Sequence, residues 1–552
     1  MNEAVININR DGQDKEDVGK DDDISIKELE AELRSAVDDS AGFLNRCADA
    51  YDTRYCLWAG QTSDGRKRRN ALGVEPFPWE GASDTRIGMA DEVINDNVIL
   101  RRPALSRARI QALPVESNDT NAAAAMTTFL NHLMVNSLSE LIRIEIPLLL
   151  NYQESYGHSV LAVTWDQEVR MQQVPLRMEE MAKEVQAGLQ AGDPQSQEAA
   201  VMLDAIADES REDEVVQYFM QTYGSLKKPQ ARKVVQELRT TGASEVPIPQ
   251  LTKNMPCWTA LRPFRDVFYP ANTSSLATAR WIAWREVISP GDLRARILVN
   301  DYDEEAVREA IEKRQGTSVL DDVRYDLGDS KVKIIDEMKG MIEIFCLYRR
   351  VTDEDGFTTI RCSEFTPGCS EKYKEDEEQK YAHREYPFVE FVSRRTGRIL
   401  IENRGTTELV ATQQTEVKTQ RDYRSDRSSI SILPPVKVSA SRPNFKLTFG
   451  PASQIPVRKS DDVEWMISPR PDADTVQIEE QVKLDVNNFF GRWAEGVHPT
   501  RQALYSQALT DDFLGAMRKV SQQTVMLCRQ DLSKEEFARI TGVRMPFGID
   551  GY

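Results

Sequence analysis

The stretch ENRGTTELVATQQTEVKTQRDYRSDRSSIS (residues 402–431) has no glycine and no proline after Gly405. A helix over Thr406–Leu433 would be about 40 Å long, because each residue of an α-helix adds about 1.5 Å. Most of its positions are Thr, Gln, Ser, Arg, Asp or Glu, and a helix this polar cannot be stabilised by a core of its own. We therefore expect it to pack through narrow seams against copies of itself or against a partner. The apolar residues available for such seams form one thin stripe at steps of seven, six and seven: Leu409, Val410, Val417, Tyr423 and Ile430.

Three stretches of the sequence resemble, in the same order along the chain, segments of tailed-bacteriophage portal proteins, also called head-to-tail connectors. PFPWEGASDTRIGMADEVI (Pro76–Ile94) is similar to the start of the family's wing domain. RPFRDVFYPANTSSLATARWIAWREVISPGDL (Arg262–Leu293) is similar to a wing strand and the helix start that follows it. REYPFVEFVSRRTGRILIENRG (residues 384–405) resembles the lead-in to the family's stem helix.

The resemblance implies an α+β protein with a portal-like fold, made of an α/β wing, long stem helices, a small α+β clip and a C-terminal helical region on the crown side. The divisions it predicts are a disordered acidic tail (1–23), the wing domain (24–302) with a helical insertion (175–246), a first stem segment (303–338), the clip (338–396), the second stem helix (402–433), returning wing strands and a helix (434–490), a channel loop (491–510), and a long helix with a short crown (511–552).

The resemblance also implies a mechanical function and no enzymatic activity. The protein would form a dodecameric, ring-closing homo-oligomer at one vertex of the capsid. The ring would be the conduit for double-stranded DNA during packaging and ejection. Its other partners would be the large subunit of the terminase, which meets the clip, the major capsid or scaffold protein, and tail adaptor proteins. The protein would be located in the virion, and in the host cytoplasm during assembly.

Basic side chains recur every three residues along the stem helix: Lys418, Arg421, Arg424 and Arg427. Because each step of three drifts by about 60° around a helix, they wind around it and do not line one face. In a ring of identical helices, Asp422 and Asp426 would pair with these cations across neighbouring copies, and direct contact with DNA is the alternative. Arg501 and Gln502, near the predicted channel loop, are further candidates for DNA contact.

The charge of the chain limits the classes of nucleic-acid protein to which it can belong. The net charge is −19, and residues 1–39, with 13 acidic and 5 basic side chains, contribute −8 of it. General DNA binding needs clustered Lys and Arg, so the charge argues against a repressor-like protein. It argues less against a conduit, whose wall should let DNA slide.

Common motifs of enzyme chemistry are missing from the sequence. There is no G-x-x-x-x-G-K-[ST] phosphate loop, no G-x-G-x-x-G, no G-x-S-x-G and no H-E-x-x-H. His132 and His158 are expected to be structural. The acidic pair Asp511–Asp512 fits a helix start better than a divalent-cation site. The seven cysteines include no C-x-x-C, which favours reduced thiols. We therefore predict no cofactor and no metal.

No membrane partner is expected, because the longest apolar run, Ile142–Leu150, is interrupted by Arg143, Glu145 and Pro147. Two other classes stay open. A nucleic-acid enzyme subunit would need convergent carboxylates, and another virion or scaffold protein would assemble through the helical insertion.

Secondary structure is readable in several places. Helical spacing extends over 24–55, 118–135 and 138–156, and His158–Trp165 alternates like a strand. Met341–Val351 and Thr358–Glu364 are predicted to form a hairpin. A dense group of aromatic residues is predicted to be core: Phe264, Phe268, Tyr269, Trp281 and Trp284.

Deleting residues 1–23 is expected to leave assembly intact, because a segment with so little apolar content cannot supply a core. Size-exclusion chromatography of the truncated and full chains tests this, and a monomeric truncated product would refute it.

Overall fold

The structure is a computed structural model that describes residues 25–56, 83, 85–107, 110–113, 120–135, 139–191, 194–206, 208, 211–222, 228–300, 302–313, 340–352, 358–379, 381–432, 436–438, 463–465, 474–492, 499–532 and 534–542. The predicted acidic tail (1–23) lies outside the described residues. Helices and antiparallel sheets are mixed along the chain, which confirms the α+β class.

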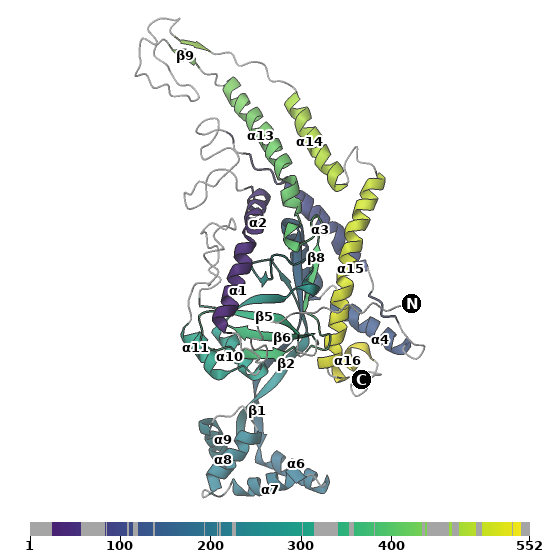
Figure 1. Cartoon of the computed structure of the whole chain (residues 1–552). Helices are drawn as coiled ribbons and strands as arrows, with labels where there is room; N and C mark the ends of the chain where they lie inside the picture. Colours follow the sequence, from purple (N-terminus) through teal and green to yellow (C-terminus); the bar gives the residue numbers. More distant parts are fainter. Residues whose placement is uncertain are drawn as a thin grey trace, which may run out of the picture.

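The centre of the body is an antiparallel sheet with strand order β3-β4-β5-β6-β7 (Figure 1). Its strands are β3 (Val267–Phe268), β4 (Trp281–Ile288), β5 (Ile342–Thr352), β6 (Thr358–Phe365) and β7 (Lys374–Glu378). β5 and β6 pair in register from Phe345↔Phe365 to Thr352↔Thr358, so the predicted hairpin is confirmed.

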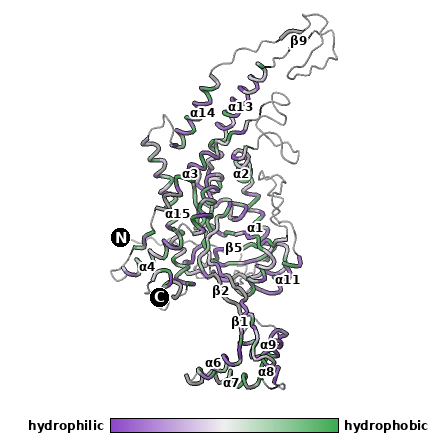
Figure 2. Tube along the Cα trace, turned by 180° about the vertical axis from the view of Figure 1, so that it is seen from behind, coloured by the Kyte–Doolittle hydropathy of each residue, from purple (hydrophilic) through white to green (hydrophobic). Residues whose placement is uncertain are grey.

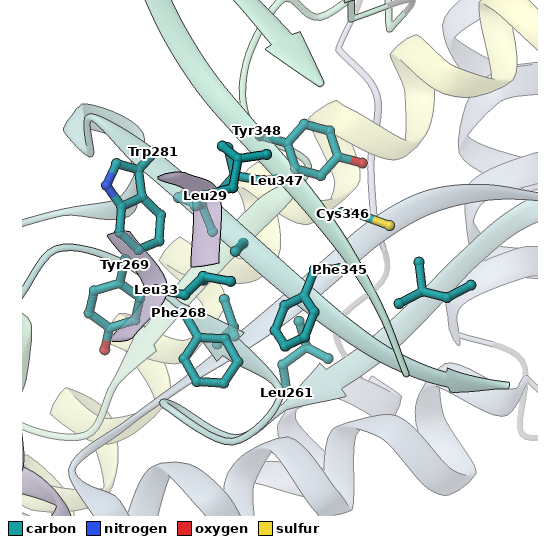
Figure 3. Close-up of a cluster of buried hydrophobic side chains, with 14 of the residues drawn as sticks. Leu29, Leu33, Leu261, Phe268, Tyr269, Trp281, Phe345, Cys346, Leu347 and Tyr348 are labelled. Atoms are coloured by element: carbon teal, nitrogen blue, oxygen red, sulfur yellow. The ribbon is translucent and has the colours of Figure 1, made fainter. Parts of the chain in front are cut away.

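One hydrophobic core joins this sheet to two helices that precede it in the sequence and to two that lie between β4 and β5. The helices are α1 (Ile26–Asp39), α2 (Ala41–Arg54), α10 (Pro290–Val299) and α11 (Glu304–Glu312). Figure 3 shows Leu29 and Leu33 of α1 beside Phe268, Tyr269 and Trp281. The predicted aromatic core is therefore confirmed. The expected helical region over 24–55 is two helices, because it breaks at Ser40.

A second sheet, β2-β1-β8, extends out of the body as a ribbon. β1 (His158–Arg177) pairs with β2 (Ala243–Leu261) along nearly its whole length, and β8 (Phe388–Val392) pairs only with the first five residues of β1. The ribbon carries four helices at its far end (Figure 1): α6 (Met178–Ala191), α7 (Pro194–Ala205), α8 (Glu212–Thr222) and α9 (Lys228–Thr241). They share a small core that includes Val215, Phe219 and Val235, so the predicted helical insertion is a peripheral unit.

A second hydrophobic core is formed by side chains of β1 and β8 and by a further set of helices. They are α3 (Met89–Arg107), α4 (Thr120–Leu130), the π-helical segments Asn131–Val135 and Leu141–Glu145, α5 (Ile146–Tyr156), α15 (Pro499–Asp531) and α16 (Lys534–Thr541). Phe129 of α4 and Phe537 of α16 meet in this core with ring centroids 5.1 Å apart. The C-terminal helices α15 and α16 are therefore part of the core of the body.

Two helices, α13 (Thr406–Ile432) and α14 (Asp474–Phe490), project from the body side by side (Figures 1 and 2). The predicted stem helix is confirmed as a helix. Beyond its end, β9 (Val436–Val438) and β10 (Val463–Trp465) pair with each other. The returning strands predicted within 434–490 therefore join neither sheet of the body.

The prediction that 338–396 form a separate clip is wrong. β5 to β7 continue the sheet of β3 and β4, and β8 pairs with β1. The physical reason is burial: residues 342–348 of β5 are all buried, and a free two-stranded hairpin cannot bury a strand in this way.

The predicted first stem segment is not found where it is described. Glu304–Glu312 is the short helix α11, whose Ala306, Val307 and Ala310 are buried in the main core. Residues 314–339 lie outside the described residues.

The predicted channel loop (491–510) is largely helix. α15 begins at Pro499, where a proline's fixed φ suits the first helical turn, and residues 493–498 lie outside the described residues. The long helix predicted from Asp511 starts earlier and ends at Asp531, with α16 as a separate helix. Asp511–Asp512 therefore lies inside a helix and not at its start.

Phe219→Ala is expected to destabilise the four-helix unit alone, by about 3–5 kcal/mol, because its core does not extend into the body. Hydrogen exchange should accelerate in α8 and α9 and stay unchanged in β5. Phe345→Ala, in the main core, is the matched control and should accelerate exchange in β5 and β6. Faster hydrogen exchange throughout the chain of the Phe219→Ala variant would show that the core of the four-helix unit is not independent of the body.

Candidate functional site: the paired helices α13 and α14

The base of α13 is fixed by one buried carboxylate. Glu154 of α5 accepts hydrogen bonds from Asn97 Nδ2 (3.0 Å) and Ser393 Oγ (2.8 Å), and from Thr406 and Arg101. Burial alone would raise the pKa of Glu154, but the Arg101 guanidinium and the hydrogen-bond donors outweigh it and hold the pKa below its usual value. In its charged form, the carboxylate therefore ties the first residue of α13 to α3, to α5 and to Ser393, the residue after β8.

The chain also approaches α5 very closely at this point. A Cβ atom at Gly405 would lie 2.2 Å from the carbonyl oxygen of Ser155, so this position requires glycine. Thr407 Oγ1 donates to the same carbonyl at 2.7 Å. The direction in which α13 leaves the body is thus set by backbone contact.

The apolar seam of α13 is filled by the same chain. Val410 and Val417 are fully buried, and they pack against α3 and α14 in one cluster: Met89, Ala90, Val93, Val482, Val486 and Phe490. The expectation that copies of the helix fill this seam is therefore wrong for these two residues. Between them, the buried Gln414 accepts from Ala90 N (2.7 Å) and donates to Thr53 O (2.8 Å).

The other predicted seam residues are less enclosed. Leu409 is partly buried against the same cluster, and Tyr423 is 45% exposed. The side chain of Ile430 lies outside the described part of the structure. The upper half of α13 therefore keeps an exposed side.

The cations of α13 are paired within the chain. Lys418 Nζ lies 2.6 Å from Asp422 Oδ2. Arg421 donates twice to Glu479 Oε1 of α14 (2.8 and 2.7 Å), and Arg424 donates to Glu479 Oε2 (2.6 Å). Arg427 also has an interaction partner. The carboxylate that pairs with Arg421 and Arg424, Glu479, comes from α14, so the spacing of basic residues along α13 could not reveal it.

Asp422 and Asp426 were expected to form ion pairs with the basic residues of a neighbouring copy. Both aspartates instead have partners within the same chain. Asp422 Oδ1 accepts from the backbone N–H of Thr85 (2.8 Å), and Asp426 Oδ1 accepts from that of Ser83 (2.7 Å). Both aspartates therefore hold the segment before α3 along the side of α13.

Glu479 is the electrostatic centre of the helix pair. Lys483 Nζ also reaches its Oε1 at 2.5 Å, so one carboxylate serves three cations. Burial works to raise the pKa of Glu479, but the hydrogen bonds from Arg421, Lys483 and Arg424 lower it to about 2. These ion pairs hold α14 against α13 at this level.

Where α14 meets α15, a cavity of about 420 Å³ opens to the surface. Arg394 forms part of its lining and lies 5.2, 5.0 and 5.0 Å from the ring centres of Phe489, Phe490 and Tyr505. Its Nη2 donates to Tyr505 Oη at 2.6 Å. The cavity is therefore lined by aromatic and aliphatic side chains, with one cation, Arg394, and one carboxylate, Asp512. Arg501 and Gln502 lie nearby in the first turn of α15, and their side chains are outside the described part.

Among the described residues, no group of three or more His, Cys, Asp or Glu side chains is placed to hold a metal ion. Nor is any helix in the described part long and apolar enough to cross a membrane. All seven cysteines are free thiols. His158 is buried in the core beside the Tyr269 hydroxyl, and burial lowers its pKa to about 3, so its structural assignment is confirmed.

No protein-family model matches the chain, and no curated protein matches it.

Sequence reasoning missed three residues that organise the site: Glu154, Arg394 and Glu479. Glu479 offered a signal, because it shares one face with the apolar residues Val482, Val486 and Phe490. A charged residue on an apolar face indicates a buried ion pair. Glu154 and Arg394 offered no such signal in the sequence.

Glu479→Gln is expected to weaken the packing of α14 by about 2 kcal/mol at pH 7. The pKa of Glu479 is lowered from 4.5 to about 2, so its contribution is complete above pH 4.5 and is lost as the pH falls to 2. The difference between wild type and variant should vanish over that range. Hydrogen exchange of α14 at several pH values measures it.

Glu480→Gln is the matched control, because this neighbouring exposed carboxylate forms no ion pair with the described residues. It should change the exchange of α14 by less than about 0.5 kcal/mol. An equal effect of both substitutions would contradict the role given to Glu479.

Proposed function

We propose that the protein is a portal protein, a ring at one capsid vertex through which double-stranded DNA enters and leaves. The observation that carries this proposal is the projecting pair α13–α14. It is long and polar, its narrow seam is already filled by its own chain, and its remaining sides are exposed. Such a pair suits side-by-side packing around an axis. The three sequence resemblances support the same class.

In this proposal the parts of the portal are reassigned. α13 and α14 together are the stem. The strands between them, β9 and β10, replace 338–396 as the clip that meets the terminase, because β9 lies at the far end of the pair and β10 pairs with it. The other residues between the two helices lie outside the described part of the structure.

The body would be the wing, and the ribbon β1–β2 would carry its four-helix unit away from the stem (Figure 1). The surfaces of α13 and α14 carry both signs of charge, which suits a wall that neither grips nor strongly repels DNA.

A ring of this kind is heterologous, because each copy uses two different faces. Its partners would be the capsid or scaffold protein, the terminase large subunit and tail adaptor proteins. Its locations would be the virion and, during assembly, the host cytoplasm.

Negative-stain electron microscopy of the purified full chain tests the proposal. We expect closed rings of about twelve units with a central hole wide enough for duplex DNA. Analytical ultracentrifugation over a range of concentrations should show one large species. A stable closed dimer at all concentrations would contradict the proposal and favour a nucleic-acid enzyme, and open heterogeneous assemblies would favour a scaffold protein.

A further inference from the structure

Away from the body, no described strand pairs with either outer edge of the β1–β2 ribbon (Figure 1). In an antiparallel pair, successive residues direct their N–H and C=O groups alternately toward the partner strand and away from it. Val163 N donates to Pro387 O at 2.8 Å, on the β8 side of β1, so the odd-numbered residues of β1 point away from β2. The Trp165 N–H points the same way, because it donates to the Tyr381 hydroxyl. The outer edge of β1 is therefore formed by its odd-numbered residues.

The register of the ribbon gives the outward residues of β2. Ala260, the partner of Leu161, points outward, since its N–H donates to Glu145 Oε2 at 2.6 Å. Each residue of β2 that lies opposite an odd-numbered residue of β1 therefore points outward as well. Three of these positions are prolines: Pro247 opposite Gln173, Pro249 opposite Met171, and Pro256 opposite Trp165. Pro256 is buried at the base of the ribbon, so the first two are the prolines that a second molecule would meet.

The two outer edges differ in what they can bind. β2 has no N–H at Pro247 or Pro249, because in proline the ring takes the place of the amide hydrogen. β1 presents four outward N–H groups in a row, and within the described part of the structure none of them has an acceptor: Gln167, Val169, Met171 and Gln173. The ribbon thus has one open edge, on β1, and one blocked edge, on β2.

We propose that Pro247 and Pro249 prevent the ribbon of one copy from joining the sheet of another copy. Any head-to-tail arrangement brings unlike edges together, the β1 edge of one copy and the β2 edge of the next. If both ribbons point the same way, the strands that meet run antiparallel, as in an ordinary sheet. The inference goes beyond the proposed function, because it holds for the proposed ring and for every other head-to-tail assembly.

The position of the two prolines along the ribbon is the one that such a contact requires. Rotation about a ring axis keeps every atom at its own height and radius. Residues that lie opposite each other within one ribbon therefore face each other again between neighbouring ribbons. Met171 and Gln173, in the open edge, would face Pro249 and Pro247 of the next copy. Proline on an edge strand is one way in which natural sheets avoid pairing with other chains.

Sedimentation velocity of the full chain tests this role. A double variant, Pro247→Val with Pro249→Val, restores two N–H groups and leaves the β1–β2 ladder in place, because both positions point outward. We expect it to form species larger than any that the wild type forms at the same concentration, with a share that grows with concentration. Hydrogen exchange of β1 reports whether the ribbon is still folded. Should that protection be lost, Pro249→Val alone takes the place of the double variant and should give a smaller increase.

Two further variants define the contact. Pro175→Val, on β1, lengthens the open edge but leaves β2 blocked, so it should sediment as the wild type does. Gln173→Pro, added to the double variant, blocks the β1 edge and should abolish the larger species. With Pro175 it repeats the spacing of Pro247 and Pro249, which this ribbon already accommodates on its other strand.

The outcomes separate this proposal from the proposed function. A folded double variant that sediments as the wild type does would overturn the role of the prolines, and so would larger species that persist with Gln173→Pro. A wild-type assembly that is lost on Gln173→Pro alone would also overturn it, because copies would then already pair through the β1 edge. A wild-type chain that forms no rings would overturn the proposed function alone.

Discussion

The buried carboxylate of Glu154 is the interaction on which the arrangement of the helices depends. It lies on α5, and it accepts a hydrogen bond or an ion pair from α3, from Ser393 just after β8 and from the start of α13. A buried charge is costly unless every lone pair is used, so each partner is held in place by the cost of losing it. With Gly405 against the backbone of α5, this network fixes where α13 begins and which way it points.

A long polar helix can leave the body because its stabilisation is distributed along it. Val410 and Val417 supply the only fully buried apolar contacts among its described residues, and Gln414 fills the space between them with two hydrogen bonds. Farther out, Glu479 replaces apolar burial with a carboxylate shared by three cations. The packing thus changes from apolar to ionic with distance from the body, and the outer part keeps exposed side chains.

The same gradient explains how the molecule could serve as one unit of a ring. Its body has two closed cores, and the four-helix unit on the β1–β2 ribbon has a third. The exposed apolar side chains of the projecting pair are few and lie beside charges. Weak contacts of this kind gain strength when they are repeated around a closed ring.

The sequence by itself determined the elements that depend on local pattern: the helix over 406–432, the hairpin of β5 and β6, the aromatic core and the helices of the insertion. Uninterrupted helical residues, alternation and apolar periodicity act over a few residues, so they can be read directly. Only the tertiary structure decided that β5 joins β4, that α13 pairs with α14, and that Glu479 takes the arginines expected to reach another copy. These pairings join residues tens of positions apart, and they are selected by burial and charge compensation, which a local pattern does not contain.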